Sequence, residues 1–279
     1  VLIFCNKIKI KYFLQGDSQM LRIVLFLLLL TYTSLFAKDY KLELGLGVGS
    51  LYYPNYIGSK TTQIITVPLP YIRYRGDYFR IDENGLSGKL FGVDGLRLDL
   101  SVSGSLPANS EQNGTREGMP DLDLTGEVGL QLIYKIFQKG VSTLEFEFPI
   151  RAVLSTDFTN LKYRGLVSNP QLKYSLDYSE FSFSFRSGVM IADENYNSYY
   201  YEVEEKYATP SRPAYKAKGG FSGIRNRIGM TYRKNNWWAG AFISHFSINN
   251  AVFKDSPLVQ THDATYAGAS VAYIFYTQD

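Results

Sequence analysis

Two residues near the end of the chain have types and a spacing that could do chemistry. His245 and Ser247 stand two positions apart, which places both side chains on one face of a β-strand. A histidine beside a serine can accept the hydroxyl proton and activate the oxygen as a nucleophile, provided that an acid orients the ring. Asp255 or Asp263 would have to be that acid. Isolated pairs of this kind are common, so we favour an incidental pair and predict no enzyme, no cofactor and no metal.

A second group of chemically interesting residues consists of charged side chains that alternate with apolar ones. The candidates for a polar lumen are Glu43, Arg97, Asp99, Asp123, Glu127, Lys135, Glu145, Glu147, Arg151, Arg186, Arg225 and Arg227. Enclosed charges persist only when they are paired or hydrated. Two interpretations stay open: a salt-bridged interior that stiffens the wall, or a small pore whose charges set its selectivity.

The segments that carry these charges have one apolar and one polar face. Leu96, Leu98 and Leu100 alternate with charged residues, and many other segments repeat the pattern over about ten residues, enough for a tilted strand to cross a bilayer. No helical segments are available to cover so much apolar sheet. A sheet in lipid must close so that no edge is left unpaired. The sequence therefore predicts an all-β fold, an antiparallel transmembrane barrel of the outer-membrane type.

The connections between these segments predict the number of strands. Bacterial barrels have short periplasmic turns and longer outer loops. From Leu96 onward long and short connections alternate, and this order extends to the whole chain only if residues 78–90 hold two short strands around Glu83-Asn84-Gly85. We therefore predict about twelve strands with both termini periplasmic, and ten strands is the alternative.

The composition agrees with a membrane barrel and the beginning of the chain with export. Aromatic residues make up 15%, with Tyr the most frequent, as in aromatic girdles, while a net charge of +3 gives no support for nucleic-acid binding. Residues 20–37 have a charged start, an apolar run and a final Ala37, which predicts a signal peptide. Residues 1–19 precede the first Met and are interpreted as an upstream extension from a misread start. Residues 38–279 then form the barrel, which contains no Cys because Cys5 lies upstream.

The longest polar connection, residues 192–219, is rich in tyrosine. Tyr196, Tyr199, Tyr200, Tyr201 and Tyr207 lie in it beside several acids. An upper aromatic girdle with solvated acids is the interpretation that we favour. The alternative is an exposed surface for recognition, to which tyrosine is suited.

Several stretches resemble a known family. Three segments are similar in order and spacing to the MltA-interacting protein/OmpV family of outer-membrane proteins. They are residues 53–59, Tyr-Pro-Asn-Tyr-Ile-Gly-Ser, residues 68–82, beginning Pro-Leu-Pro-Tyr-Ile-Arg-Tyr-Arg-Gly-Asp, and residues 255–259, Asp-Ser-Pro-Leu-Val. The match runs from about Leu42 to Phe275. Such barrels usually end on an aromatic residue that the insertion machinery reads; here Tyr273, Phe275 and Tyr276 are the candidates, although Thr277-Gln278-Asp279 follow.

The resemblance implies a function that the residue pattern itself does not. A family member links a lytic murein transglycosylase to a peptidoglycan synthase, so the implied role is a non-enzymatic scaffold, and a porin-like channel or surface adhesin is the alternative. The implied location is the outer membrane of a Gram-negative bacterium, with lipid, lipopolysaccharide and the barrel-assembly machinery as partners. The His245–Ser247 spacing also resembles that of outer-membrane lipid A deacylases, a remote alternative that the length of the chain disfavours.

Overall fold

The computed structural model describes residues 41–76, 79–82, 85–111 and 114–278. The expected signal peptide and upstream extension lie outside the described residues. Thirteen strands form one sheet. They are β1 (Lys41–Pro54), β2 (Thr62–Arg75), β3 (Phe79–Asp82), β4 (Gly85–Val93), β5 (Leu96–Ser105), β6 (Leu124–Lys139), β7 (Ser142–Thr156), β8 (Leu161–Ser168), β9 (Gln171–Tyr178), β10 (Phe181–Ala192), β11 (Gly220–Lys234), β12 (Trp237–Ser247) and β13 (Asp263–Gln278).

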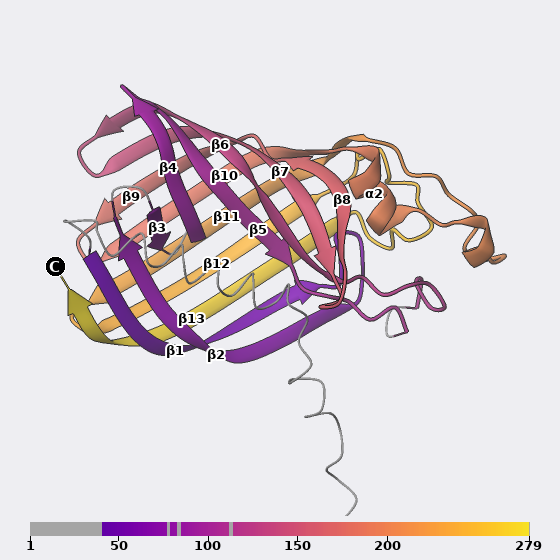
Figure 1. Ribbon diagram of the computed structural model, residues 1–279, viewed down its shortest axis with the longest axis horizontal. Helices are drawn as coiled ribbons and strands as arrows, with labels where there is room; N and C mark the ends of the chain where they lie inside the picture. Colours follow the sequence, from indigo (N-terminus) through magenta and orange to yellow (C-terminus); the bar gives the residue numbers. More distant parts are fainter. Residues whose placement is uncertain (1–40, 77–78, 83–84, 112–113, 279) are drawn as a thin grey trace, which may run out of the picture. The chain divides into compact units, whose positions relative to one another are not determined.

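The sheet closes into a barrel (Figure 1) because β13 pairs antiparallel with β1. β8 and β9 both pair with β7, β8 along its second half and β9 along its first half. They occupy a single place in the ring on either side of Asn169-Pro170, where proline, which has no N–H, interrupts the ladder. The described residues therefore form twelve strand positions. The predicted barrel is confirmed, as are the two strands expected in residues 78–90, although the second of them, β4, extends to Val93.

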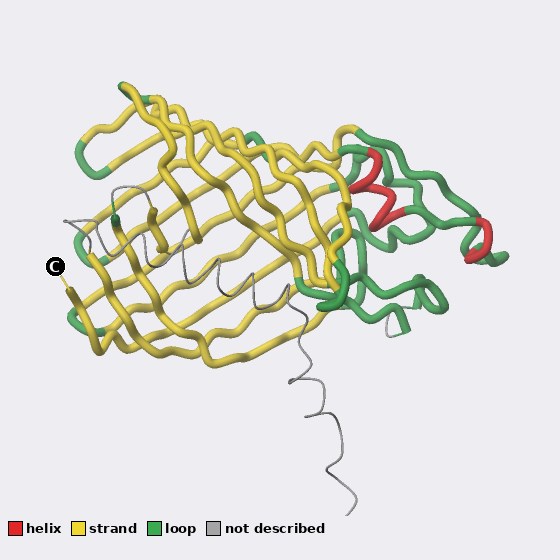
Figure 2. The backbone as a smooth tube through the Cα atoms, viewed as in Figure 1, coloured by secondary structure: helices red, strands yellow, loops and turns green. Residues whose placement is uncertain are grey.

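Tight turns gather at one end of the barrel and long loops at the other. Gly95, Gly140, Ser179 and Asn235 lie in the short connections, each with a positive φ between 52° and 75°. Glycine and asparagine adopt this left-handed conformation at little cost, which is why they recur at tight hairpins. Figure 2 shows the long loops and the helices gathered at the opposite end. By the usual asymmetry of bacterial barrels, the short-turn end is periplasmic and the long-loop end faces outward.

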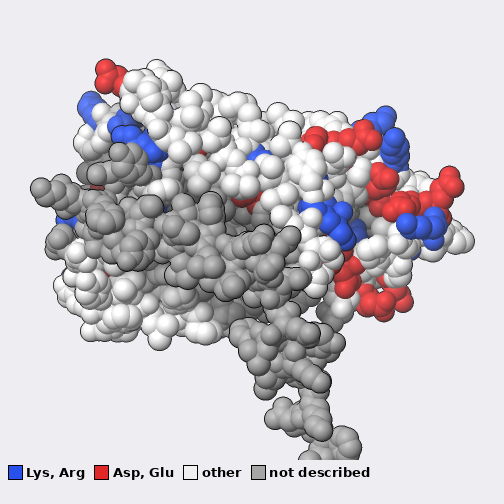
Figure 3. Space-filling view, in the orientation of Figure 1, with Lys and Arg blue, Asp and Glu red and all other residues white. Residues whose placement is uncertain are grey.

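The outward face of the wall is apolar. Leu46, Ile64, Ile228 and Ile243 leave between 52% and 73% of their surface exposed, as expected for side chains that face lipid. Figure 3 shows the charged side chains of the visible face mostly at its two ends, with a largely uncharged belt between them. No helix in the described part of the chain has the length and apolar character needed to cross a membrane.

The long-loop end is filled by packed side chains. After β10 the chain forms α2 (Glu194–Tyr201), which begins where the Asp193 carboxylate accepts a hydrogen bond from the Tyr196 N–H, and then a short 3-10 helix, η3 (Glu205–Tyr207). Tyr196, Tyr200 and Tyr201 are buried in one cluster with inward residues of the wall, including Val153, Val167 and Met190. We call α2 and the loop residues 55–61, 107–111, 114–123 and 248–262 the outer plug.

Hydrogen bonds tie the parts of the outer plug to one another. Tyr201 stacks on Phe253 with ring centroids 3.6 Å apart and donates to the Ile57 carbonyl oxygen at 2.9 Å. Arg116 donates to the Tyr200 carbonyl oxygen at 3.0 Å. For Tyr196, Tyr200 and Tyr201, both interpretations of this loop, the girdle and the exposed recognition surface, are wrong. These side chains form a core because a helix, rather than extended strands, carries them inward.

Candidate functional site

The inner surface of the barrel is lined by ion pairs, beginning near the short-turn end. Glu43 on β1 accepts two hydrogen bonds from Arg233 on β11, both 2.7 Å long, and lies 3.8 Å from Arg73 on β2. The Tyr71 hydroxyl also donates to Glu43, at 3.3 Å. β11 and β2 are not neighbours in the ring, so this carboxylate holds together cations from both sides of the β13–β1 pair.

A second cluster joins β7 to β9 and β10. Lys173 lies 3.3 Å from Glu145 and 3.7 Å from Glu147. Arg186 also lies 3.7 Å from Glu147, and Gln171 donates to it at 2.7 Å. Both carboxylates are buried, so the surrounding cations and the amide compensate for their lost hydration.

A third cluster centres on Arg151, which is 8% exposed. Its Nε donates to Glu127 at 2.7 Å, its Nη1 to the Ser101 hydroxyl at 3.3 Å and its Nη2 to the Asn169 side chain at 2.8 Å. The guanidinium thereby connects β5, β6 and the interruption between β8 and β9. Its three nitrogens each have a partner, which is the condition for a buried arginine to be tolerated.

The remaining acids of the predicted set, Asp99 and Asp123, contact side chains outside these clusters, and Lys135 lies near the rim. Arg97 donates to Asp99 at 2.7 Å, and Asp123 accepts from the Ser155 hydroxyl at 3.2 Å below the outer plug. Lys135 is exposed and donates to Gln138 at 2.8 Å. The structure therefore brings half of the predicted charges, Glu43, Glu127, Glu145, Glu147, Arg151 and Arg186, into three separate clusters.

Arg225 and Arg227 differ from these residues because aromatic rings, and no acid, are their close partners among the described residues. The Arg225 guanidinium lies 5.1 Å from the Phe246 ring centroid and donates to the Ser244 hydroxyl at 3.2 Å. The Arg227 guanidinium stacks over Phe242 at 4.0 Å. Such stacking stabilises a cation without neutralising it. Both arginines therefore retain an unneutralised positive charge inside the barrel.

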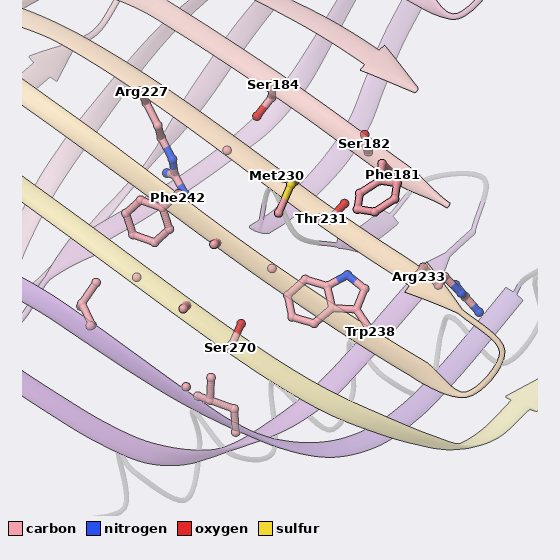
Figure 4. Close-up of a pocket in the computed structure, with 18 of the residues that line it drawn as sticks. Phe181, Ser182, Ser184, Arg227, Met230, Thr231, Arg233, Trp238, Phe242 and Ser270 are labelled. Carbon is pink, nitrogen blue, oxygen red and sulfur yellow. The ribbon is translucent and has the colours of Figure 1, made fainter. Parts of the chain in front are cut away.

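A cavity of about 850 Å³ runs from the short-turn end toward the middle of the barrel. Its cationic wall comes from β2, β9, β10 and β11, and Arg73, Arg186, Arg227 and Arg233 are among its residues. Figure 4 shows Arg227 beside Phe242, with Trp238 and Arg233 nearer the lower end of the cavity. The cavity also reaches Leu51, Ile65 and Leu106, so it extends from the short turns to just below the outer plug.

The His245–Ser247 pair lies outside this lumen. Ser244 and Phe246 are buried inside, and alternation along β12 turns His245 and Ser247 to the outer face. His245 Nε2 lies 3.3 Å from an Asp263 oxygen, while Ser247 accepts a hydrogen bond from Asn249 at 2.8 Å. In the described part of the chain no hydrogen bond joins His245 to Ser247, and each of the two side chains has a different partner.

The proposed insertion residues lie on the outer face at the short-turn end. Tyr273 packs edge-on against Trp237 with ring centroids 5.2 Å apart, and Phe275 and Tyr276 are exposed by 64% and 44%. An exposed aromatic cluster at this level fits an inner interfacial girdle.

Several lumen residues were missed by the sequence reasoning. Arg73, Lys173 and Arg233 belong to the ion-pair clusters but were not among the predicted lumen residues. Lys173 and Arg233 could have been included, because apolar residues alternate around each of them along its strand. Ile65 and Leu69 face the cavity although they are apolar. No alternation could reveal those two, because residues 64–72 are apolar on both faces.

A closed antiparallel barrel with an apolar belt, a charged interior, short turns at one end and long loops at the other defines an outer-membrane β-barrel protein. The family model of the MltA-interacting protein MipA matches residues 46–275, and the chain belongs to that family. It is 27% identical over 205 residues to outer membrane protein OmpV of Vibrio cholerae, covering 72% of this chain and 76% of that protein. It is 25% identical, with the same coverage, to outer membrane protein Omp26La of Vibrio anguillarum. These likenesses agree with an outer-membrane location.

Among solved structures, the chain is similar to a bacterial polysaccharide outer membrane secretin, with a TM-score of 0.43, 9% identity and coverage of 86% of this chain and 99% of that one. It is also similar to OprB of Pseudomonas putida, with a TM-score of 0.33, 10% identity and coverage of 88% and 96%.

Proposed function

We propose that this protein is a non-enzymatic scaffold of the outer membrane that holds a lytic transglycosylase at its periplasmic end. The observation that carries the proposal is the asymmetry of the barrel. Packed tyrosines occupy the long-loop end, whereas the cavity extends down to the short turns, where Glu180 and Arg233 are among its residues. A protein built to pass solutes needs both ends open, but a docking platform needs only an accessible periplasmic end. The family description names MltA as the interacting protein, which supplies the partner; a peptidoglycan synthase would be the second enzyme bridged.

The surface available for docking is the ring of short turns. Lys139 ends β6 and is exposed, and Lys234 ends β11 with 59% of its side chain exposed. Glu180, 3.7 Å from Lys234, adds an acid to the same rim. Charged rim residues set orientation and association rate more than affinity. The short turns therefore suit an enzyme that is already tethered to the membrane and needs only to be oriented.

The test is capture of a purified MltA-type transglycosylase by the detergent-solubilised barrel. Reversing two turn charges, with Lys139→Glu and Lys234→Glu together, should weaken capture. Lys206→Glu is the matched control, because Lys206 is equally exposed, at 62%, but lies in η3 among the outer loops. Equal capture by all forms, or equal loss in the control, would refute a periplasmic docking surface.

A small channel is the competing function, favoured by the unneutralised charges of Arg225 and Arg227. Planar-bilayer recordings separate the two possibilities. The scaffold proposal expects insertion without conductance steps, because the outer plug blocks the lumen. Discrete steps that disappear when Arg225 and Arg227 are replaced by Gln would establish a charge-lined transport path instead.

A further inference from the structure

Within the described part of the chain, one edge of β2 is mostly unpaired. β2 pairs with β1 along its whole length, but its other edge pairs with β3 only where Tyr74 and Arg75 face Ile81 and Arg80. Among the described residues, none pairs with residues 62–73 on that side. Residues 102–105 of β5 likewise pair with β6, and with no described residue on the β4 side. We call the interval between these two edges the seam; along β2 it covers residues 62–73, and along β5 it is confined to residues 102–105 at the long-loop end.

The sequence of β2 is adapted to such an edge. The Asn55 N–H donates to the Thr61 carbonyl at 3.0 Å, so the odd-numbered residues of β2 direct their N–H groups toward β1. The Gly76 N–H donates to Phe79 on the other side at 2.9 Å, which confirms that even-numbered residues point away. Pro68 and Pro70 are even-numbered, so the N–H groups that they lack would have faced the seam. Proline is confined to free edges of sheets for this reason.

The same prolines indicate what the seam meets. A strand added by a partner needs a continuous row of donors and acceptors along the edge. Pro68 and Pro70 remove two neighbouring donors from that row. In lipid, by contrast, each missing N–H is one fewer unsatisfied group. The edge is therefore poorly suited to receive another β-strand, and its two missing donors lower, without removing, the cost of facing acyl chains.

Behind the seam, the wall of the cavity is apolar. Ile65, Val67 and Leu69 point inward from β2, and Leu106, which follows β5 across the seam, lines the same cavity. Strands of a lumen normally turn polar residues inward, so this apolar strip departs from the pattern of the other strands. Phe242 and Trp238 extend the apolar surface from β12.

The opposite wall supplies an anion site. Glu43 forms ion pairs with both Arg73 and Arg233, and Glu145 and Glu147 together balance Lys173 and Arg186. Arg227 lines the cavity with Phe242 as its close partner and with no ion pair to any described residue. An arginine of this kind presents its donors to a carboxylate or a phosphate. The cavity therefore has one apolar and one cationic side, and its volume of about 850 Å³ lies within the range of ligand pockets.

We propose that this cavity binds a single-chain anionic amphiphile drawn from the membrane, with its acyl chain at the seam against Ile65, Val67 and Leu69 and its anionic group at Arg227. This binding function is independent of the scaffold function, and neither needs the other.

The two tryptophans of the chain provide the test. Trp238 lines the cavity, whereas its neighbour Trp237 faces outward and is 54% exposed. The protein purified in detergent is prepared as Trp237→Phe and as Trp238→Phe, and each form is titrated with a brominated fatty acid, which quenches tryptophan on contact. Trp238 should be quenched saturably. Trp237 should be quenched without saturation, because it samples the probe dissolved in the micelle.

Substitutions then assign the two sides of the cavity. Arg227→Gln, in the Trp237→Phe background, should raise the apparent dissociation constant about tenfold, whereas Arg227→Lys should preserve most of the affinity. Val67→Ser should weaken binding by about threefold to tenfold. Thr66→Ser is the matched control, because Thr66 lies beside Val67 but points outward and bonds to Ser50; its binding should be unchanged.

The brominated methyl ester, which lacks the negative charge, should bind the unsubstituted cavity as weakly as the acid binds the Arg227→Gln form. Failure of saturable quenching at Trp238 would overturn the proposal. So would equal binding of the acid and the ester, or an Arg227→Gln form with unchanged affinity. Capture of the transglycosylase is measured separately, so loss of amphiphile binding and loss of scaffolding are distinguishable outcomes.

Discussion

Replacing Arg151 should test whether the inner clusters hold the barrel together. The side chains of Arg151 and Glu127 are only 9% and 13% exposed, and their contact is 2.7 Å long. Arg151→Leu removes the cation and leaves Glu127 enclosed without its partner. Breaking a buried pair on one side costs about 3–5 kcal/mol, because the remaining charge is uncompensated. Loss of the bonds to Ser101 and Asn169 acts in the same direction.

The assay is equilibrium urea unfolding of the barrel in lipid vesicles, followed by tryptophan fluorescence. The double variant Arg151→Leu with Glu127→Leu should recover most of the lost stability, since no unpaired charge remains. Lys216→Ala is the control, because its pair with Glu194 is largely exposed and its loss should leave the midpoint unchanged. If Arg151→Leu costs less than about 1 kcal/mol, the lumen is wet enough to screen its charges, and the inner clusters do not hold the barrel together.

Three further outcomes are expected. Burial raises the pKa of Tyr199 to about 12 and that of Tyr201 well above its usual value of about 10. The outer plug should therefore be stable below pH 10 and open as the pH rises through the raised pKa values, which would appear as a delayed tyrosinate absorbance and as protease cleavage of the loops. Titration of these tyrosines at the usual pKa would contradict this. Gly129→Ala should destabilise the barrel by about 1–3 kcal/mol, because an added Cβ would lie 1.9 Å from a carbonyl oxygen of β7, whereas Gly126→Ala, with open space, should not shift the urea midpoint. Ser247→Ala should leave lipid A unchanged by mass spectrometry, and a changed acylation pattern would revive the hydrolase hypothesis.

The fold was predictable from the sequence because alternation and turn spacing constrain each other. Leu144, Phe146 and Phe148 face lipid, while Glu145 and Glu147 between them face the lumen. The requirement that hairpins alternate between the two ends then forced two strands into residues 78–90, where no clear alternation exists. The break between β8 and β9 was not predicted, because it depends on where β7 pairs and not on any local pattern except Pro170.

The partners of the lumen charges were beyond sequence reasoning. Glu43 and Arg233 are separated by 190 residues and meet through barrel closure. The sequence shows that both face inward, but the stagger of the strands decides which charges lie at the same height. The helix α2 was missed for a related reason: its tyrosines have no clear helical periodicity, and their burial depends on loops from three other parts of the chain.

β2 shows why a strand that lines the lumen is not always recognisable from alternating polar and apolar residues. A strand between lipid and an apolar cavity is apolar on both faces, so the period of two that identifies barrel strands is lost in Ile64-Ile65-Thr66-Val67. The same stretch contains Pro68-Leu69-Pro70, which taken locally argues against any central strand. Both irregularities have one explanation if β2 is an edge that opens to the membrane on one side and to the cavity on the other. Pro68 and Pro70, which locally argue against a central strand, are therefore the residues that locate the seam.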